Sequence, residues 1–377
     1  MLDAAGRRPR RLPTCSLPPS AFWAKILAMH LARVRLVGLG PFDDLSLSFS
    51  VDDLAPRPLT VILGGGGVGK TTLLGAIAST RPGNAVVQHR ARSSRLAHAV
   101  AFWRMGQDEP DRPHPLRVAS PNAQLDEPEE VSLMHRREQA LFDKRAAEGG
   151  FVLLHFPSVR WFSRTPVLLT APERTVARYD VRASHNVDDA TRGDLARETK
   201  QALCYAAIAS ALCRRDPPHP QRARLLELDS SMRQVVSSLT GLTGHPFLGA
   251  DPLTFEPLFG APSGDTVLFD ELPTGTRNLA AFAALTLRAV HAAYPELPPQ
   301  QAEAVVLVDD VGLHLETSVA QRLVPALRRV LPRVQWILTT SSTTVAASCE
   351  TGELLALRRT PPSQRIELYE GAQAVVH

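Results

Sequence analysis

The chain has 377 residues, of which 44% are hydrophobic and 21% are charged. At about 150 residues per domain this length favours roughly two domains. No window has the uninterrupted apolar length that a membrane helix requires, so the sequence predicts a soluble globular protein without a membrane partner. The cysteines form neither a Cys-x-x-Cys pair nor a dense disulfide pattern, which favours a reducing compartment and a cytoplasmic location.

The basic character of the chain, with a pI of about 9.1, comes from its first 28 residues. They hold five basic side chains against Asp3, a net of +4, and the whole chain is also +4, so residues 29–377 are formally neutral. A folded basic face, and with it tight DNA binding, therefore has weak support. We expect residues 1–28 to be a disordered tail or to be untranslated, with Met29 as the alternative start. A signal peptide is not expected, because the apolar stretch 21–29 is short and carries Lys25.

Alternating and apolar stretches predict strands at residues 31–39, 45–51 and 58–64, before a glycine-rich loop. A helix over residues 71–79 follows the loop. Short apolar segments at 84–89, 96–106 and 114–120 are separated by Pro, Asp and Gly, and they predict a β-rich flank. The first part of the core is thus expected to span residues 29–190.

The second half of the chain alternates helices with apolar strands. Helices are expected at 122–147, 195–213 and 222–242, and a strand at 149–156. A helical subdomain is placed at 191–270. The remaining core, 271–377, reads as a helix at 275–293, a strand at 304–310, a helix at 317–331, a strand at 334–340, and two strands about a Pro-Pro turn at 353–370. This order predicts a parallel sheet buried on both faces.

The stretch "GGGGVGKTT" fits the phosphate-loop pattern G-x-x-x-x-G-K-[ST], between an apolar strand and a helix. Glycines let the backbone wrap a phosphate, while the helix N-terminus, a lysine and a hydroxyl supply donors and a magnesium ligand. The expected nucleotide-binding residues are Gly64, Gly65, Gly66, Gly67, Val68, Gly69, Lys70, Thr71 and Thr72.

Two further segments point to the same chemistry. The apolar run "AVVLVDD" ends in Asp309, placed to ligate Mg²⁺ with Thr71, and Asp310, placed to act as a base. Ligands of open α/β sheets bind at the carboxyl ends of strands, where both acids are expected. The stretch "LPTGTRNL" opens a helix at Thr274 and Gly275, whose N-terminus is a second anion-binding end.

The order of "GGGGVGKTT", "LPTGTRNL", "VVLVDDVGLHLE" and "WILTTSSTTV" resembles the ABC-type ATPase heads of the RecF, SMC and OLD group. There these segments are the Walker A loop, the signature motif, Walker B with its D-loop, and the switch segment. The likeness covers about residues 29–348, loosely in the middle third. It implies an α/β P-loop NTPase fold of the ABC-head type with a β-rich N-terminal flank and a helical subdomain. It also implies two heads that sandwich two ATP molecules with Mg²⁺.

The departures from that family fall on hydrolysis positions. The family's catalytic glutamate falls on Asp310, its signature serine on Pro273 and its switch histidine on Ser341. We list Asp310 and Ser341 as candidate catalytic residues, and Thr274 could replace the missing serine. Nucleotide binding is expected to survive these changes, whereas hydrolysis is expected to be slow.

Several other residues have open interpretations. The family's magnesium-contacting glutamine falls on Gln88 or, as an alternative, Gln107. His314 reads as a packed or interface histidine. The tryptophans at 103, 161 and 336 read as core residues. Arg160 and Arg164 read as surface arginines, with phosphate contact as the alternative.

Without a coiled-coil arm or a nuclease domain, the chain is expected to be a head alone. The leading hypothesis is an ATP-gated homodimer switch that serves an effector protein in DNA repair or anti-phage defence. The alternatives are a nucleotide-binding interaction module that does not hydrolyse ATP, and a RecF-like ATPase that binds DNA.

Overall fold

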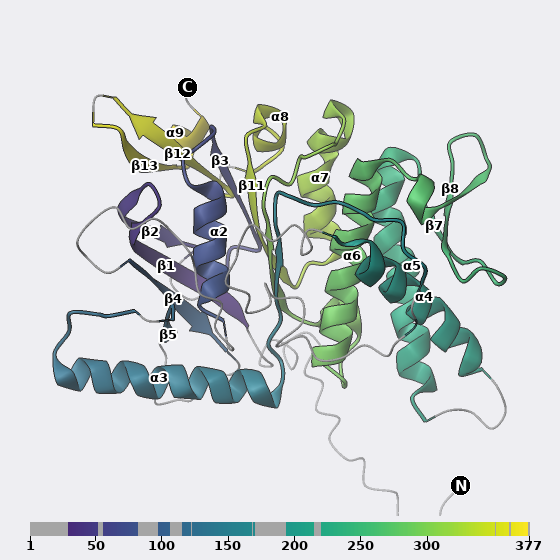
Figure 1. Cartoon of the computed structure of the whole chain (residues 1–377), viewed down its shortest axis with the longest axis horizontal. Coiled ribbons are helices and arrows are strands. Elements are labelled where there is room, and N and C mark those ends of the chain that lie inside the picture. Colours follow the sequence, from purple (N-terminus) through teal and green to yellow (C-terminus); the bar gives the residue numbers. More distant parts are fainter. Residues whose placement is uncertain are drawn as a thin grey trace, which may run out of the picture.

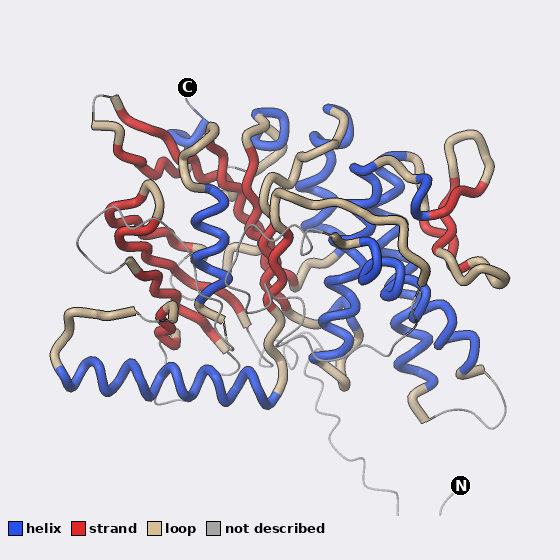
Figure 2. Tube along the Cα trace, in the orientation of Figure 1, coloured by secondary structure: helices blue, strands red, loops and turns tan. Residues whose placement is uncertain are grey.

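A computed structural model describes residues 29–51, 56–81, 97–105, 115–121, 123–167, 169, 194–214, 220–350, 352–361 and 363–375. Three sheets and two groups of helices make up this part of the chain (Figures 1 and 2). The glycine-rich loop follows a central strand of the largest sheet, at the carboxyl ends of its parallel strands.

The largest sheet has six strands in the order β13-β12-β3-β11-β10-β6. Five of them are parallel, and β13 at one edge is antiparallel to β12. Their bounds are β3 (Leu59–Gly64), β6 (Leu153–Phe156), β10 (Ala304–Val308), β11 (Val334–Thr340), β12 (Leu354–Thr360) and β13 (Arg365–Glu370). One strand, β11, separates β3, which precedes the glycine loop, from β10, which precedes Asp309, so both loops leave the sheet at the carboxyl ends of its parallel strands.

Both faces of this sheet are buried, as predicted from its uninterrupted apolar strands. Along β10, Val305 and Leu307 belong to one hydrophobic cluster, while Ala304, Val306 and Val308 belong to another. Side chains of a strand alternate between the two faces, so the two clusters lie on opposite sides of the sheet.

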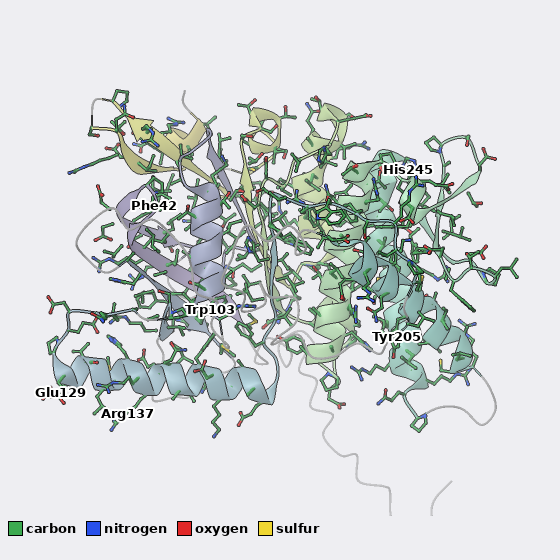
Figure 3. The ribbon with its side chains drawn as sticks, viewed as in Figure 1. Phe42, Trp103, Glu129, Arg137, Tyr205 and His245 are labelled. Carbon is green, nitrogen blue, oxygen red and sulfur yellow. The ribbon has the colours of Figure 1, made fainter. Side chains whose placement is uncertain are left out.

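The first cluster covers one face with helix α2 (Lys70–Ser79) and a four-stranded antiparallel sheet, β2-β1-β4-β5. The strands are β1 (His30–Leu39), β2 (Phe42–Ser48), β4 (His98–Arg104) and β5 (Leu116–Ala119). Figure 3 shows Phe42 and Trp103 within this part of the molecule. Helix α3 (Glu129–Glu148) packs along β5, and Figure 3 shows its Glu129 and Arg137 pointing away from the body.

The second cluster covers the other face with four helices. They are α4 (Ala196–Leu212), α5 (Arg222–Thr240), α6 (Thr274–Ala293) and α7 (Thr317–Val330). Almost every residue of α6 is buried, because it packs between the sheet and the pair α4–α5. Figure 1 shows α2 and α6 on opposite sides of the parallel sheet.

A three-stranded antiparallel sheet follows α5 and lies beside the helices. It consists of β7 (Phe247–Ala250), β8 (Pro257–Gly260) and β9 (Thr266–Leu268). Sequence analysis places these residues in a helical subdomain and does not anticipate the sheet. The strands are only three or four residues long, so they carry little of the alternating pattern by which a strand is recognised.

Short helices complete the described part: α8 (Thr343–Ala346), α9 (Ala372–Val375), η2 (Gly241–Thr243), η3 (Phe269–Glu271) and η4 (Pro299–Gln301). A search of the described helices finds none with the length and hydropathy to cross a bilayer. The expected strand at 84–89 lies outside the described residues.

One of the three core tryptophan assignments is wrong. Trp103 and Trp336 are fully buried, but the side chain of Trp161 is 42% exposed. Its segment is an irregular connection that leaves β6, and a bridge to Asp194 is its one strand-like pairing with the residues that the structure describes. The apolar letters around Trp161 therefore do not mark a buried strand.

Candidate functional site

The glycine loop is held by packing at its two ends and is open along its middle. A Cβ atom at Gly64 would lie 2.6 Å from Val68 Cγ2, and one at Gly69 would lie 2.5 Å from the Phe42 ring. Gly69 also has φ of +95°, which L side chains rarely adopt. A Cβ at Gly65 or Gly66 would meet nothing within 4 Å. The exposed middle of the loop is therefore accessible to a ligand, whereas Val68 is a buried packing residue.

Lys70 begins helix α2 and folds back over this loop. Its ammonium donates hydrogen bonds to the carbonyl oxygens of Gly64 at 2.7 Å and Gly65 at 2.8 Å. Burial lowers the pKa of this ammonium, and the nearby carboxylates of Asp310 and Asp309 act in the opposite direction. The predicted phosphate-binding lysine and the two predicted acids thus lie within electrostatic reach of one another.

Asp309 links the glycine loop to two strands of the sheet. Its Oδ2 accepts a hydrogen bond from Thr71 Oγ1 at 2.6 Å, and its Oδ1 accepts one from Thr339 Oγ1 at 2.5 Å. Asp309 is only 1% exposed. The sequence pattern predicts the pairing of Asp309 with Thr71, 238 positions apart in the chain. It does not predict the part of Thr339, which is the residue before last in β11.

Asp310 begins the turn that leaves β10. Its φ is +49°, a left-handed conformation that Asp and Asn tolerate better than most residues. Its backbone N–H donates to Thr339 Oγ1 at 2.8 Å. The same threonine hydroxyl therefore fixes the Asp309 carboxylate and the backbone of Asp310.

Arg160 lies behind this turn, and the interpretation of it as a surface residue is wrong. Its side chain comes from the segment after β6 and is 5% exposed. It donates to the carbonyl oxygens of Asp309 and, at 3.0 Å, Asp310. Burial lowers its pKa to about 10, against the effect of the two carboxylates, so it stays charged at neutral pH. The sequence signal that could reveal it is its position just after a strand that pairs with β10.

The N-terminus of α6 lies against the segment that follows β10. A Cβ at Gly275 would lie 2.3 Å from the carbonyl oxygen of His314, so only glycine fits there. Thr274 begins the helix as predicted, no side chain caps it, and its Oγ1 accepts a hydrogen bond from Arg277 at 3.3 Å. His314 itself is exposed and has φ of +61°, so it is not a packed residue, and its interpretation as an interface histidine stays a prediction.

The remaining predicted residues have different outcomes. Ser341 is exposed directly after β11, at the same edge of the sheet, and Thr72 packs against the turn at Gly40. Gln88 and Gln107 both lie outside the described residues. Arg359, which sequence analysis does not single out, reaches from β12 to donate to the carbonyl oxygen of Gly67 at 3.2 Å.

The donor set fits a nucleotide phosphate with magnesium. Thr71 and Asp309 offer hard oxygen atoms 2.6 Å apart, the type of ligand that Mg²⁺ prefers. The open glycines and Lys70 stand at the start of a helix, where an anion is stabilised. Among the described residues no group of three or more His, Cys, Asp or Glu side chains could hold a metal ion, so Thr71 and Asp309 would bind Mg²⁺ together with the phosphate.

The strand order and the loop geometry together confirm the predicted α/β P-loop NTPase fold with a β-rich N-terminal flank and a helical part. No family model matches the chain.

The chain is similar to several solved head domains. The SMC head domain from Thermotoga maritima is 13% identical, with a TM-score of 0.46, over 91% of this chain and 99% of that one. An SmcHead bound to the C-winged helix domain of ScpA is 12% identical, with a TM-score of 0.48, over 90% and 98%. An Smc head with an extended coiled coil, bound to the C-terminal domain of ScpA derived from Pyrococcus furiosus, is 12% identical, with a TM-score of 0.47, over 91% and 97%.

Proposed function

We propose that the chain binds ATP with Mg²⁺ at the glycine loop and that ATP brings two copies of it together. The observation that carries the proposal is the junction of Thr71, Asp309 and Thr339, which joins the phosphate loop to the acidic strand. A carboxylate held by two hydroxyl groups beside an open glycine loop at a helix N-terminus supplies the oxygen ligands and the anion site that Mg²⁺ and a phosphate require.

Each residue of the site has a definite part in this proposal. The loop N–H groups and Lys70 would hold the β- and γ-phosphates, because a cation and a helix N-terminus both stabilise negative charge. Thr71 and Asp309 would hold Mg²⁺, which neutralises phosphate charge when bound. Asp310 would orient or deprotonate the attacking water.

Dimerisation is supported by the placement of the two helix N-termini. The N-terminus of α2 lies at Lys70 on one face of the sheet, and the N-terminus of α6 lies at Thr274 on the other. The segment that follows β10 contacts both helix starts, since Asp309 accepts a hydrogen bond from Thr71 and His314 lies against Gly275. One chain therefore offers its second anion-binding end away from its own loop, where the phosphate of a second copy could reach it.

Hydrolysis is expected to be slow. Asp310 is one methylene shorter than a glutamate, which draws the carboxylate back by roughly 1 Å, and such a displacement can cost about 100-fold in rate. Pro273 has neither hydroxyl nor N–H for the γ-phosphate, and Ser341 lacks the second nitrogen of a histidine. A long-lived ATP dimer would suit a signal read by an effector protein in DNA repair or phage defence.

The first test is titration of a fluorescent ATP analogue with Mg²⁺. Lys70→Ala should lose at least about tenfold in affinity, because a charge-assisted contact is worth about 1.5–3 kcal/mol. Lys144→Ala is the matched control, since Lys144 is 72% exposed on α3. Equal affinity of all three proteins would refute the site.

The second test compares sedimentation and phosphate release for wild type, Asp310→Asn and Asp310→Glu. Asn keeps the left-handed turn and removes the charge, so it separates chemistry from backbone strain. We expect an ATP-dependent dimer in wild type and Asp310→Asn, and lower phosphate release in Asp310→Asn. An ATP-dependent dimer without any phosphate release would instead identify the interaction module, and a monomer in saturating Mg-ATP would refute the sandwich.

DNA binding is the remaining alternative, and the charge distribution gives it little support. Non-specific DNA affinity comes mainly from phosphate neutralisation, and residues 29–377 are formally neutral. A salt series of duplex binding tests this. Tight binding with a steep salt dependence would favour a RecF-like role.

A further inference from the structure

We propose that Arg160 is a positioning residue that couples the Asp309–Asp310 turn of one chain to its signature helix α6. The inference rests on the proposed function, because α6 is assigned there to the nucleotide of the second copy. In this role, ATP binding at the glycine loop would favour the position of α6 in which its N-terminus can bind the nucleotide of the second copy.

The guanidinium of Arg160 contacts three separate parts of the fold. Its Nη1 donates to the carbonyl oxygens of Pro157, at 2.7 Å, and Asp309, and its Nη2 donates to the carbonyl oxygen of Asp310. Its Nε donates to Asn278 Oδ1 on α6 at 3.4 Å. The plane also lies over the Phe282 ring of α6, with its carbon 5.3 Å from the ring centre.

These contacts require the shape of arginine and not only its charge. Three nitrogens of one rigid plane reach four oxygen acceptors on three segments, whereas lysine has a single nitrogen. A lysine at position 160 would keep a cation near the turn, but it would not join the turn to α6.

The Arg160 guanidinium connects the glycine loop and Asp309, which would bind the chain's own nucleotide, with the N-terminus of α6, which would bind the nucleotide of the second copy. Asp309 lies at the glycine loop through Thr71, and Asn278 lies one helical turn after Thr274. A shift of the Asp309–Asp310 backbone would therefore be transmitted through the Arg160 plane to the start of α6. Coupling between two sites needs such a connected element with differential contacts in each state.

The experiment compares wild type, Arg160→Lys and Asn278→Ala for ATP-analogue affinity, ATP-dependent dimerisation, kcat and KM. At protein concentrations where the chain is monomeric, Arg160→Lys should bind the analogue with unchanged affinity, because Lys70, Thr71 and Asp309 are intact. Its dimer dissociation constant should rise, and its kcat fall, by about tenfold or more, the usual size of a coupling between sites. KM should stay the same.

Arg288→Lys is the matched control for a merely structural arginine. Arg288 is also buried and lies on α6. Its Nη1 donates to Glu198 on α4 at 3.0 Å. We expect it to lower the melting temperature while the dimer constant and kcat of the folded protein stay at wild-type values. Melting curves of all variants show whether Arg160→Lys is simply unfolded.

A double-mutant cycle tests the path through Asn278. If Arg160 acts through this side chain, Arg160→Lys/Asn278→Ala should lose no more coupling than Arg160→Lys alone. Fully additive losses would overturn the path.

The outcomes separate the two proposals. A wild type that does not bind ATP overturns the proposed function. A wild type that binds and dimerises while Arg160→Lys matches it in every readout overturns only the coupling role. If wild-type turnover is below detection, the dimer dissociation constant alone decides the coupling role. A wild type that binds ATP without dimerising overturns both the proposed dimer and the coupling role.

Discussion

Thr339 is the residue whose loss should show most directly how the site is held together. The substitution Thr339→Val keeps the shape and removes only the hydroxyl. That hydroxyl donates to Asp309 Oδ1 at 2.5 Å and accepts from the Asp310 N–H at 2.8 Å, in a fully buried position. The variant therefore leaves a partly buried N–H without its acceptor and a buried carboxylate without one donor.

The expected loss of stability follows from those two groups. A buried unsatisfied N–H costs about 1–3 kcal/mol and a hydrogen bond to a charged group is worth about 1.5–3 kcal/mol. The added valine methyl returns roughly 1 kcal/mol of apolar burial. We expect a net decrease of about 2–4 kcal/mol in the free energy of unfolding, measured by urea denaturation.

Thr60→Val on β3 is the matched control. Thr60 is fully buried in the same sheet, and its hydroxyl has no hydrogen-bond partner among the described residues. Its replacement should be neutral or stabilising, because an unpaired buried hydroxyl is itself unfavourable. Equal losses for the two variants would refute the assignment of Thr339 as the residue that holds Asp309.

The same variant tests the magnesium assignment. Groups that orient a metal-ligating carboxylate usually contribute about 10- to 100-fold to metal affinity. Thr339→Val should therefore raise the Mg²⁺ concentration for half-maximal ATP binding by about tenfold, while Thr60→Val should not change it. An unchanged Mg²⁺ requirement would show that the Thr339 hydroxyl does not orient a magnesium ligand.

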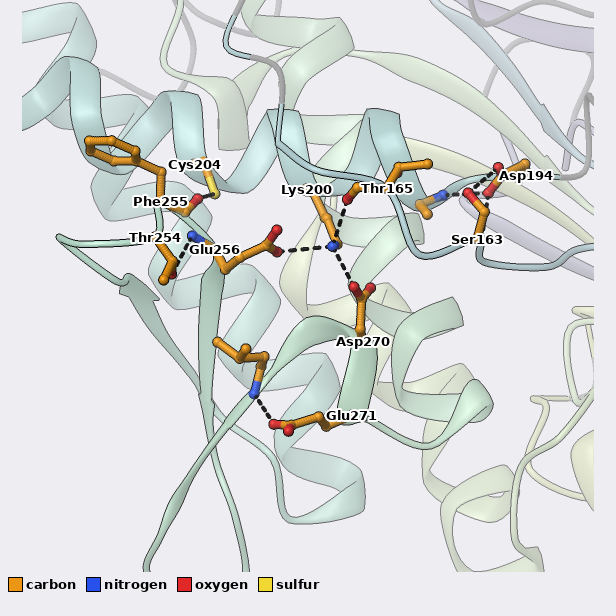
Figure 4. A network of polar contacts seen from close by, with 12 residues as sticks. Ser163, Thr165, Asp194, Lys200, Cys204, Thr254, Phe255, Glu256, Asp270 and Glu271 are labelled. Carbon is orange, nitrogen blue, oxygen red and sulfur yellow. Dashed lines mark hydrogen bonds and ion pairs between the residues drawn. The ribbon is translucent and has the colours of Figure 1, made fainter.

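Three further predictions concern stability. Lys200→Met should cost about 3–5 kcal/mol, because Lys200 is completely buried and pairs with Asp270 at 2.7 Å and Glu256 at 2.9 Å (Figure 4). In urea titrations the free energy of unfolding of Lys144→Met should stay near the wild-type value. An equally small change for Lys200→Met would contradict the prediction. Pro325→Ala, at an exposed position inside α7, should raise the melting temperature, since proline is about 3 kcal/mol less favourable than alanine in a helix interior. A lower melting temperature would show that the proline shapes this helix. Burial, followed by the charge of Arg224, lowers the pKa of His291 from 6.5 to about 4, so the folded chain binds fewer protons than the unfolded chain between these values. When the pH falls from 7 to 5, the free energy of unfolding of wild type should therefore decrease by about 2 kcal/mol more than that of His291→Gln. Parallel pH profiles of the two proteins would refute this prediction.

Local sequence patterns were enough to predict the order of the main elements. Residues 304–308 are apolar without interruption, as a strand buried on both faces must be, and the glycine loop lies between a strand and a helix. Helices α4, α5, α6 and α7 follow from periodic segments bounded by Pro and Gly. The pairing of Thr71 with Asp309 was also predictable, because the carboxyl ends of parallel strands share one edge.

Residues of irregular segments could not be placed in the same way. Arg160 and Trp161 are neighbours in one connection, yet one is buried and the other is 42% exposed. A segment without a repeating backbone has no periodicity from which burial can be read. Only the packing of α6 and the turn after β10 against this segment decides which side chain points inwards.

The sequence by itself therefore determined the phosphate loop, the acidic strand and the helix that opens at Thr274, because each depends on neighbouring residues and on strand or helix periodicity. The tertiary structure alone decided that Thr339, Arg160 and Asn278 join these parts. Their hydrogen bonds connect β11, the segment after β6 and α6 with the turn after β10, across 29 to 150 positions of the chain. Such contacts arise from the way the elements pack, and no local pattern encodes them.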